Sequence, residues 1–341
     1  MRPGFATAEG TAAYALRFGG TDFYRRVQGL HLSNLGLGTY LGEPDAETDQ
    51  RYTEAAVAAM ASGINVLDAA INYRNQRSER SMGAALEGVA REEVVVCTKA
   101  GFLTPGAIPD SLREEDVVGG MHAMAPGFLT DQIERSCQNL GIATLDVFYL
   151  HNPETQLSFV SREVFLERVR RAFDALEQLA ERGTIRFYGT ATWDGYRKPA
   201  HAREALNLEE LAAIARQAGG AQHHFRFVQL PLNLAMAEAF TQRDGGGRSV
   251  LDIARALDIA VVASATLMQA KLSRGLPEAF TQHFPGFATD AQRAIQFTRS
   301  TPGVDIALVG MSSVAHVAEN LAVAGTPRLL PEAYRSLYRS N

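Results

Sequence analysis

The sequence predicts a (β/α)8 barrel of the TIM type, and three observations support this prediction. Eight short apolar runs alternate with longer segments of helical periodicity, no Pro/Ser-rich linker divides them, and a chain of 341 residues is long enough for one such barrel. We therefore expect a single domain over residues 1–341, with the barrel at about 30–325, an N-terminal extension at 1–29 and long loops at the C-terminal mouth.

The eight predicted strands are residues 32–40, 64–70, 94–99, 145–151, 185–192, 225–232, 259–266 and 304–310. They are apolar with little alternation, which is typical of parallel strands covered by helices. The rival fold is a doubly wound open sheet. Its glycine fingerprint, GxGxxG followed by a helix, is missing, because the first strand continues as GLGTYLG.

Helices are predicted between the strands. The clearest is residues 161–182, where apolar side chains recur at three- and four-residue spacing and Gly183 follows as a stop signal. Asp45, Thr130 and Ser249 precede further helical segments and are predicted N-cap residues.

Two connections, residues 100–129 and 233–248, exceed the usual loop length. Because barrel enzymes build their sites from loops at the carboxyl ends of the strands, we expect both connections to shape or cover a site.

Composition excludes several classes of protein. The net charge of −5 and the lack of a Lys/Arg-rich run argue against a nucleic-acid surface. The two cysteines, Cys97 and Cys137, lack metal-ligand spacing, which indicates a reducing compartment and hence the cytoplasm, with no metal site expected. No apolar run reaches about 18 residues, so we expect no membrane span. Disorder is expected only at the first few residues and the tail, and no obligate protein partner is expected.

Three consecutive predicted strands end in Asp68, Lys99 and His151, and Tyr73 lies in the turn after the first of these. Strand ends converge on one mouth in a barrel, so the four side chains are expected to meet. An ammonium beside a phenol favours the phenolate, so Lys99, held by Asp68, is expected to lower the pKa of Tyr73 and make it a general acid/base. His151 would donate a hydrogen bond to a developing oxyanion. This chemistry protonates a carbonyl oxygen, and reduction also requires a hydride donor such as nicotinamide.

The sequence resembles the aldo-keto reductase family over nearly the whole barrel. The resemblance rests on LGLGTY, on INVLDAAINYRNQRSERSMGAAL around Asp68 and Tyr73, on VVVCTKAG at Lys99, on LDVFYLHNPE at His151, on GTIRFYGTATW, and on VDIALVGMSSVAHVAENL. It implies that Tyr73 is the proton donor, that Lys99 and Asp68 lower its pKa, and that His151 orients the substrate carbonyl of an aldehyde or ketone.

The resemblance also implies a nicotinamide cofactor extended across the barrel mouth, with NADP favoured by the habit of the family and NAD not excluded. The expected cofactor-binding residues are Gly38, Thr39, Asp68, Ala191, Thr192, Gln229, Ser264, Gly310, Ser312, His316, Glu319 and Asn320. The expected substrate pocket comprises Tyr40, Phe102, Phe128 and Trp193.

Three features depart from the pattern of the family. Ala191 and Thr192 stand where Ser-Asn usually holds the carboxamide, and the seventh strand lacks the aromatic residue that usually stacks on the nicotinamide. The stretch 309–321 contains no Lys or Arg, and His316 stands near the usual basic residue that grips the 2′-phosphate of NADP.

Two alternative functions stay open at the level of the sequence. A barrel lyase could form a Schiff base on Lys99. The altered cofactor shell would also suit a redox-sensing regulatory subunit with little turnover.

Overall fold

The computed structural model describes residues 1–19 and 22–338. Eight parallel strands close into a barrel in the order β10-β11-β12-β3-β4-β5-β8-β9. They are β3 (Leu35–Gly38), β4 (Val66–Asp68), β5 (Val95–Ala100), β8 (Leu145–His151), β9 (Ile185–Ala191), β10 (Phe225–Pro231), β11 (Ala260–Ser264) and β12 (Ile306–Gly310). Seven lie within the predicted apolar runs and β5 extends one residue beyond its run, to Ala100, so the predicted (β/α)8 fold is confirmed.

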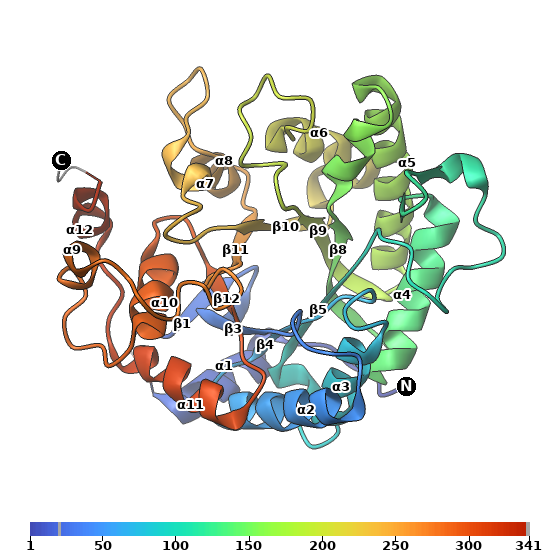
Figure 1. Cartoon of the computed structure of the whole chain (residues 1–341). Helices are drawn as coiled ribbons and strands as arrows, with labels where there is room; N and C mark the ends of the chain where they lie inside the picture. Colours follow the sequence, from blue (N-terminus) through green and yellow to red (C-terminus); the bar gives the residue numbers. More distant parts are fainter. Residues whose placement is uncertain (20–21, 339–341) are drawn as a thin grey trace.

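Helices surround the strands as an outer ring (Figure 1). The helices that follow the barrel strands are α2 (Ala46–Ala61), α3 (Arg77–Leu86), α4 (Pro126–Leu140), α5 (Arg162–Glu181), α6 (Leu208–Gly219), α8 (Val250–Ala256), α10 (Asp290–Ser300) and α11 (Val314–Leu321). Shorter elements in the connections are α7 (Glu238–Thr241), α9 (Glu278–Thr281), α12 (Pro331–Ser336) and the 3-10 helices η1 (Arg91–Glu93), η2 (Glu114–Asp116), η3 (Pro153–Ser158), η4 (Gly220–Gln222) and η5 (Ala322–Gly325). No helix in the described part of the chain combines the length and apolarity needed to cross a membrane.

The predicted helix starts are right at two of three positions. The side chain of Asp45 accepts a hydrogen bond from the N–H of Thr48, and Ser249 forms a capping box with Asp252. The N-cap prediction for Thr130 is wrong, because α4 already begins at Pro126 and the Thr130 hydroxyl donates to the Pro126 carbonyl within the helix. Proline suits the first helical position, where no N–H is needed for a helical hydrogen bond.

The core has two layers, which explains why the strands are apolar on both faces. Inside the barrel, Val66, Val95, Val147, Tyr149 and Phe227 belong to one buried cluster. Outside it, alternate strand residues pack against the helices in a larger cluster. Both cysteines are free and buried.

The N-terminal extension packs against the end of the barrel opposite the mouth. It comprises α1 (Ala8–Phe18) and an antiparallel hairpin of β1 (Tyr24–Val27) and β2 (Leu30–Ser33). Arg2 exchanges backbone hydrogen bonds with residues 141 and 143, so the disorder expected at the first few residues is wrong. The tail, where disorder was also expected, includes residues 339–341, which lie outside the described part of the chain.

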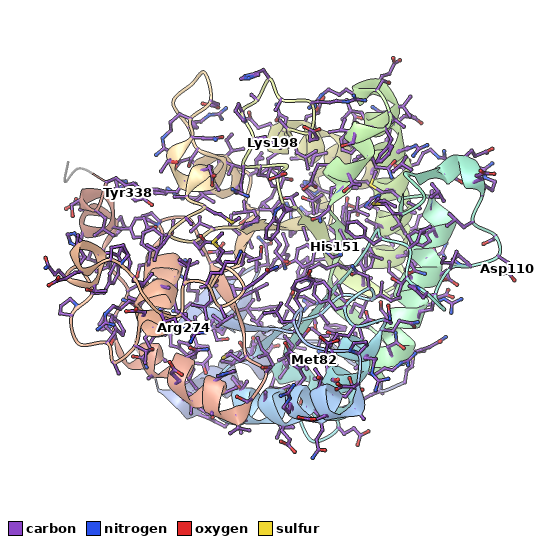
Figure 2. All side chains as sticks on the ribbon, in the orientation of Figure 1. Met82, Asp110, His151, Lys198, Arg274 and Tyr338 are labelled. Carbon is purple, nitrogen blue, oxygen red and sulfur yellow. The ribbon has the colours of Figure 1, made fainter. Side chains whose placement is uncertain are left out.

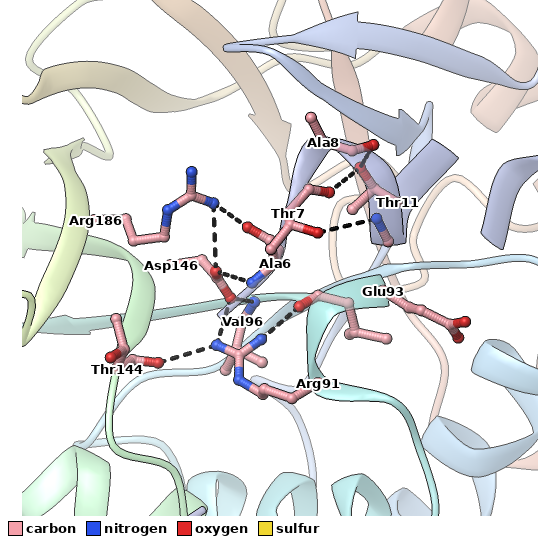
Figure 3. Close-up of polar contacts among 12 residues, drawn as sticks. Ala6, Thr7, Ala8, Thr11, Arg91, Glu93, Val96, Thr144, Asp146 and Arg186 are labelled. Atoms are coloured by element: carbon pink, nitrogen blue, oxygen red, sulfur yellow. Dashed lines mark hydrogen bonds and ion pairs between the residues drawn. The ribbon is translucent and has the colours of Figure 1, made fainter. Parts of the chain in front are cut away.

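A buried ion pair anchors this extension (Figure 3). Asp146, near the start of β8, lies 2.6 Å from Arg91, and both side chains are almost completely buried. The same carboxylate accepts hydrogen bonds from the N–H groups of Ala6 and Val96. Because every Asp146 oxygen is paired, the desolvation of the two charges is compensated, and the extension is tied to two strands of the barrel.

Candidate active site

The carboxyl ends of the barrel strands enclose a cavity of about 560 Å³. Its walls include Asp68, Tyr73 and His151, and Lys99 lies buried beneath it with no exposed side-chain surface. Figure 2 shows His151 near the centre of the ring of helices, whereas Asp110 lies at the periphery. The structure therefore brings the four predicted catalytic side chains together at one mouth.

Lys99 is the centre of the polar cluster. Its Nζ atom donates to Oδ1 of Asp68 at 2.6 Å and to the carbonyl of Ala69 at 2.8 Å, and it lies 3.4 Å from the hydroxyl of Tyr73. The other Asp68 oxygen accepts from the amide of Gln229 at 2.8 Å. Both Asp68 oxygens are thus hydrogen-bonded within the protein, and Tyr73 lines the cavity above the buried Lys99.

The charge states follow from burial and from these contacts. Burial alone would lower the pKa of Lys99, but Asp68 and Tyr73 outweigh it, so the pKa lies above its ordinary value and the amine is an ammonium. Burial raises the pKa of Tyr73, and the opposing effect of Lys99 is smaller. The expected lowering of the Tyr73 pKa is therefore wrong for this state, because loss of water around the phenol outweighs an ammonium 3.4 Å away. Tyr73 carries its proton at neutral pH.

Backbone conformation and a buried arginine fix the turn that presents Tyr73. The three residues after it, Arg74, Asn75 and Gln76, all have positive φ angles of 49–71°. Such strain persists only where the surroundings impose it. The guanidinium of Arg74 lies 2.5 Å from Asp49 and over the ring of Tyr52, both on α2. Sequence reasoning missed Arg74, because an arginine in a polar turn carries no signal that it will be buried.

His151 is buried and neutral. Burial, with smaller contributions from Lys99 and His122, lowers the pKa of His151 well below its ordinary value. Its ring lies edge-on to Tyr73 and Phe102, with centroid distances of 5.7 and 5.2 Å. The Nδ1 atom is buried without a hydrogen-bond partner among the described residues, so Nε2 is the nitrogen available to a bound molecule.

Ten of the twelve predicted cofactor-binding residues line the cavity: Gly38, Thr39, Asp68, Ala191, Thr192, Gln229, Ser264, Gly310, Ser312 and His316. The other two, Glu319 and Asn320, lie further along α11 and do not line it. The backbone N–H of Thr192 donates to the carbonyl of Gln229, which joins the ends of β9 and β10. The amide nitrogen of Gln229 donates to Asp68, which leaves its oxygen and its second N–H for a ligand.

Three of the four predicted substrate-pocket residues, Tyr40, Phe102 and Trp193, line the cavity. Phe128 does not, because it lies in α4 and is buried in the core between the helices and the barrel. The carboxylate of Glu154, which sequence reasoning missed, holds the Trp193 segment. Its Oε1 atom accepts from the N–H groups of Trp193, Asp194 and Gly195.

The two long connections contribute less than expected. Of residues 100–129, Phe102 lines the cavity, and none of residues 233–248 does. Residues 265–270 after β11, of which 265 and 266 were predicted as the end of the seventh strand, were not predicted to line the cavity but supply Ala265, Thr266, Leu267, Gln269 and Ala270. None of the described residues that line the cavity is a lysine or arginine, so the cavity offers an anion only histidines, amides, hydroxyls and backbone groups.

Comparisons with known proteins identify a family model, relatives and solved structures that are similar to the chain. The model of the "Aldo/keto reductase family" matches residues 34–283. An Escherichia coli protein named NADH-specific methylglyoxal reductase is 30% identical over 190 residues, so the match spans about half of that relative, 54% of each chain. A Schizosaccharomyces pombe protein provisionally named voltage-gated potassium channel subunit beta is 24% identical over 91% of this chain and 90% of its own. The fold is similar to that of a Klebsiella pneumoniae aldo/keto reductase solved with NADP and acetate, with a TM-score of 0.67 at 21% identity over 94% of this chain and 95% of the other.

Proposed function

The chain belongs to the aldo/keto reductase family, and from that premise we propose that it is an NAD(P)(H)-dependent oxidoreductase that interconverts an uncharged aldehyde or ketone and its alcohol. The observation that carries the proposal is the convergence of Tyr73, His151 and the buried Asp68–Lys99 pair on one cavity. We also propose that residues 1–341 act as one domain and that the protein is cytoplasmic.

The residues of the mouth fit a nicotinamide dinucleotide. The cavity extends from Tyr73 and His151 to Ser312 and His316, at the start of α11. At the end of β12, a Cβ atom on Gly310 would meet no atom within 4 Å, so this backbone borders open space. Thr266, in the wall, has a buried hydroxyl without a partner in the described chain. The first N–H groups of α11 would take a phosphate. When bound, the cofactor supplies the hydride that no side chain can supply.

The side chains of this protein then have separate roles. Tyr73, protonated because burial raises its pKa, gives its proton to the carbonyl oxygen during reduction. Lys99 stabilises the resulting phenolate, and Asp68 holds Lys99 charged at 2.6 Å. His151 donates from Nε2 to the same carbonyl oxygen and thereby sets its direction.

For the cofactor, we propose that NADH serves at least as well as NADPH. Binding a 2′-phosphate normally uses an arginine or lysine, and none is among the described residues that line the cavity. The lack of a cation among these residues thus opposes the preference for NADP that the resemblance favoured.

The same lack of lysine and arginine supports an uncharged substrate. Tyr40, Phe102 and Trp193 offer apolar surface, while Asn72 and Asn152 offer amides. A carboxylate or phosphate on the substrate would lose water in this cavity without gaining a cation, which is costly. A carbonyl compound with aromatic or apolar substituents fits these walls.

A Schiff-base lyase is disfavoured. Lys99 is fully buried, contacts Asp68, Ala69 and Tyr73, and has a raised pKa, whereas a Schiff-base lysine must be neutral to attack. A regulatory subunit with little turnover stays the second candidate. The name of the Schizosaccharomyces pombe relative and the Ala191–Thr192 departure favour it.

The test is fluorescence titration of the purified protein with NADH and NADPH, followed by a carbonyl panel that includes 4-nitrobenzaldehyde and its anionic analogue 4-carboxybenzaldehyde. We expect micromolar binding of NADH and faster turnover of the neutral aldehyde. Binding without turnover on the whole panel would favour the regulatory subunit. A folded protein that binds neither nucleotide would refute the proposal.

A further inference from the structure

The imidazole of His151 is held without a hydrogen bond to its inner nitrogen. Nδ1 is buried and unpartnered among the described residues, so the orientation of the ring depends on the rings of Tyr73 and Phe102 and on the backbone of the residue itself. The neighbours of Phe102 and of the His151 carbonyl therefore decide where Nε2 points.

Phe102 lies between two imidazoles. One edge-on contact is with His151 and the other is with His122, each with a centroid distance of 5.2 Å and nearly perpendicular planes. Phe102 and His122 also form an isolated antiparallel bridge. His122 belongs to β7 (His122–Ala123), which pairs with β6 (Val117–Val118) in the connection after β5.

His122 also contacts the backbone of His151. Its Nε2 atom lies 2.8 Å from the His151 carbonyl, and its Nδ1 atom lies 2.8 Å from the amide nitrogen of Gln156 on η3. The Gln156 oxygen in turn accepts from Arg168 on α5 at 2.5 Å. This chain of hydrogen bonds runs from a guanidinium near the surface to the carbonyl of the residue that faces the substrate.

The two ends of the chain fix the direction of every hydrogen bond. A guanidinium can only donate and a carbonyl can only accept, so Gln156 donates to Nδ1 and His122 donates from Nε2. His122 must be neutral, with its proton on Nε2. It is completely buried, and burial lowers its pKa to about 4, which agrees with this state.

The approach of the two segments requires a glycine next to Phe102. A Cβ atom on Gly101 would lie 2.5 Å from the His151 carbonyl and 2.6 Å from Nε2 of His122, closer than any side chain tolerates. Glycine at position 101 is therefore required for the hydrogen bond between His122 and the His151 carbonyl, at the end of β5.

We propose that His122 is a positioning residue for His151. By holding the His151 carbonyl and one face of Phe102, it directs Nε2 of His151 to the carbonyl oxygen of the substrate. The proposal rests on the function proposed above, because its kinetic effect requires that His151 acts on a substrate.

The experiment compares His122→Leu, which removes both hydrogen bonds, with His122→Gln, whose amide N–H reaches about as far as Nε2. His223→Leu is the matched control, because His223 is also buried but lies two residues before β10, at the opposite end of the barrel. We expect His122→Leu to lower kcat by about 10- to 100-fold, the scale of a misplaced catalytic group. The dissociation constant for NADH should stay within about twofold, and His122→Gln should recover most of kcat.

A second readout does not require turnover. The imidazole NMR signal of His151, identified by its loss in His151→Asn, should shift in His122→Leu and stay in place in His223→Leu. If kcat and the His151 signal are unchanged in a folded His122→Leu, or if His223→Leu lowers kcat equally, the positioning role is wrong. If the wild type reduces no carbonyl but the NMR signal shifts as expected, the proposed function fails and the structural coupling stands.

Should His122→Leu not fold, Arg168→Met, which removes the outer donor of the chain, gives the same comparison with a smaller expected shift.

Discussion

Replacing Tyr73 by phenylalanine should separate activity from stability. The hydroxyl lies 3.4 Å from Lys99, whereas Lys99 keeps shorter hydrogen bonds of 2.6 Å to Asp68 and 2.8 Å to the Ala69 carbonyl. The variant therefore loses the weakest of the three contacts, and the ring stays beneath the ammonium, whose Nζ atom is 4.8 Å from its centroid. We expect the free energy of unfolding to change by less than about 1 kcal/mol.

The same substitution removes the proton that the carbonyl oxygen must receive. Positioned proton transfer contributes about 10² to 10⁴ in rate, so kcat should fall by at least about 10², a barrier increase of roughly 3 kcal/mol or more. The affinity for NADH should be nearly unchanged. Urea unfolding, nucleotide titration and steady-state kinetics on the best aldehyde of the panel measure the three quantities.

The matched control is Tyr14→Phe. The buried hydroxyl of Tyr14 on α1 lies 2.5 Å from the Met60 carbonyl and 3.0 Å from that of Ile64, at the end of the barrel opposite the mouth. Its loss should cost about 1 kcal/mol of stability and leave kcat unchanged. The reasoning about Tyr73 fails if Tyr73→Phe keeps more than about a tenth of the wild-type kcat, or if its loss of activity merely follows a loss of stability like that of the control.

Three other predictions concern the adenosine end, the barrel base and the pH. His316→Arg should tighten NADPH by about 1 kcal/mol, roughly fivefold, through a charge-assisted phosphate contact and leave NADH unchanged in parallel titrations; equal affinities before and after would place the 2′-phosphate elsewhere. Asp146→Ala leaves the Arg91 guanidinium buried without its carboxylate partner, so urea unfolding should show a loss of about 3–5 kcal/mol with kcat per folded molecule unchanged; a loss below about 1 kcal/mol would contradict the anchoring role. Burial lowers the pKa of His122 from 6.5 to about 4. Between pH 6.5 and 4 the imidazole is therefore protonated in the unfolded chain but neutral in the folded chain, and the folded state loses stability as the pH falls. At about 1.4 kcal/mol per pH unit, the contribution of neutral His122 to the free energy of unfolding is complete above pH 6.5, and roughly 3 kcal/mol of it is lost by pH 4. The prediction is wrong if the free energies of unfolding of the wild type and of His122→Gln change in parallel over this pH range.

The arrangement of the barrel could be predicted because its strands are buried on both faces. Each strand is then a continuous apolar run, and Gly183 or the capping residues Asp45 and Ser249 mark helix ends beside it. The meeting of Asp68, Lys99 and His151 followed directly, because parallel strands end at one mouth.

The features of the site that the sequence did not predict depend on contacts between segments far apart in the chain. The loop after β11 follows an apolar run without a glycine or proline signal, although Ala265, Met268, Gln269 and Ala270 all have positive φ angles. The raised pKa of Tyr73 depends on the amount of water excluded from its turn, and no sequence pattern reports that amount. Phe128 failed as a pocket residue because α4 begins earlier than the Thr130 signal suggested and turns that ring into the core.

β8 carries Asp146 near one end and His151 at the other, about 17 Å apart for an extended chain. The contacts at the end of the barrel opposite the mouth can therefore stabilise the fold independently of the residues that line the cavity. A library that randomises Tyr40, Trp193 and residues 265–270 can accept substitutions that cost a few kcal/mol, provided that the network of Asp146, Arg91 and Ala6 is kept. For the same reason, an affinity tag at the N-terminus should be avoided, because Arg2 exchanges backbone hydrogen bonds with residues 141 and 143 at this end of the barrel.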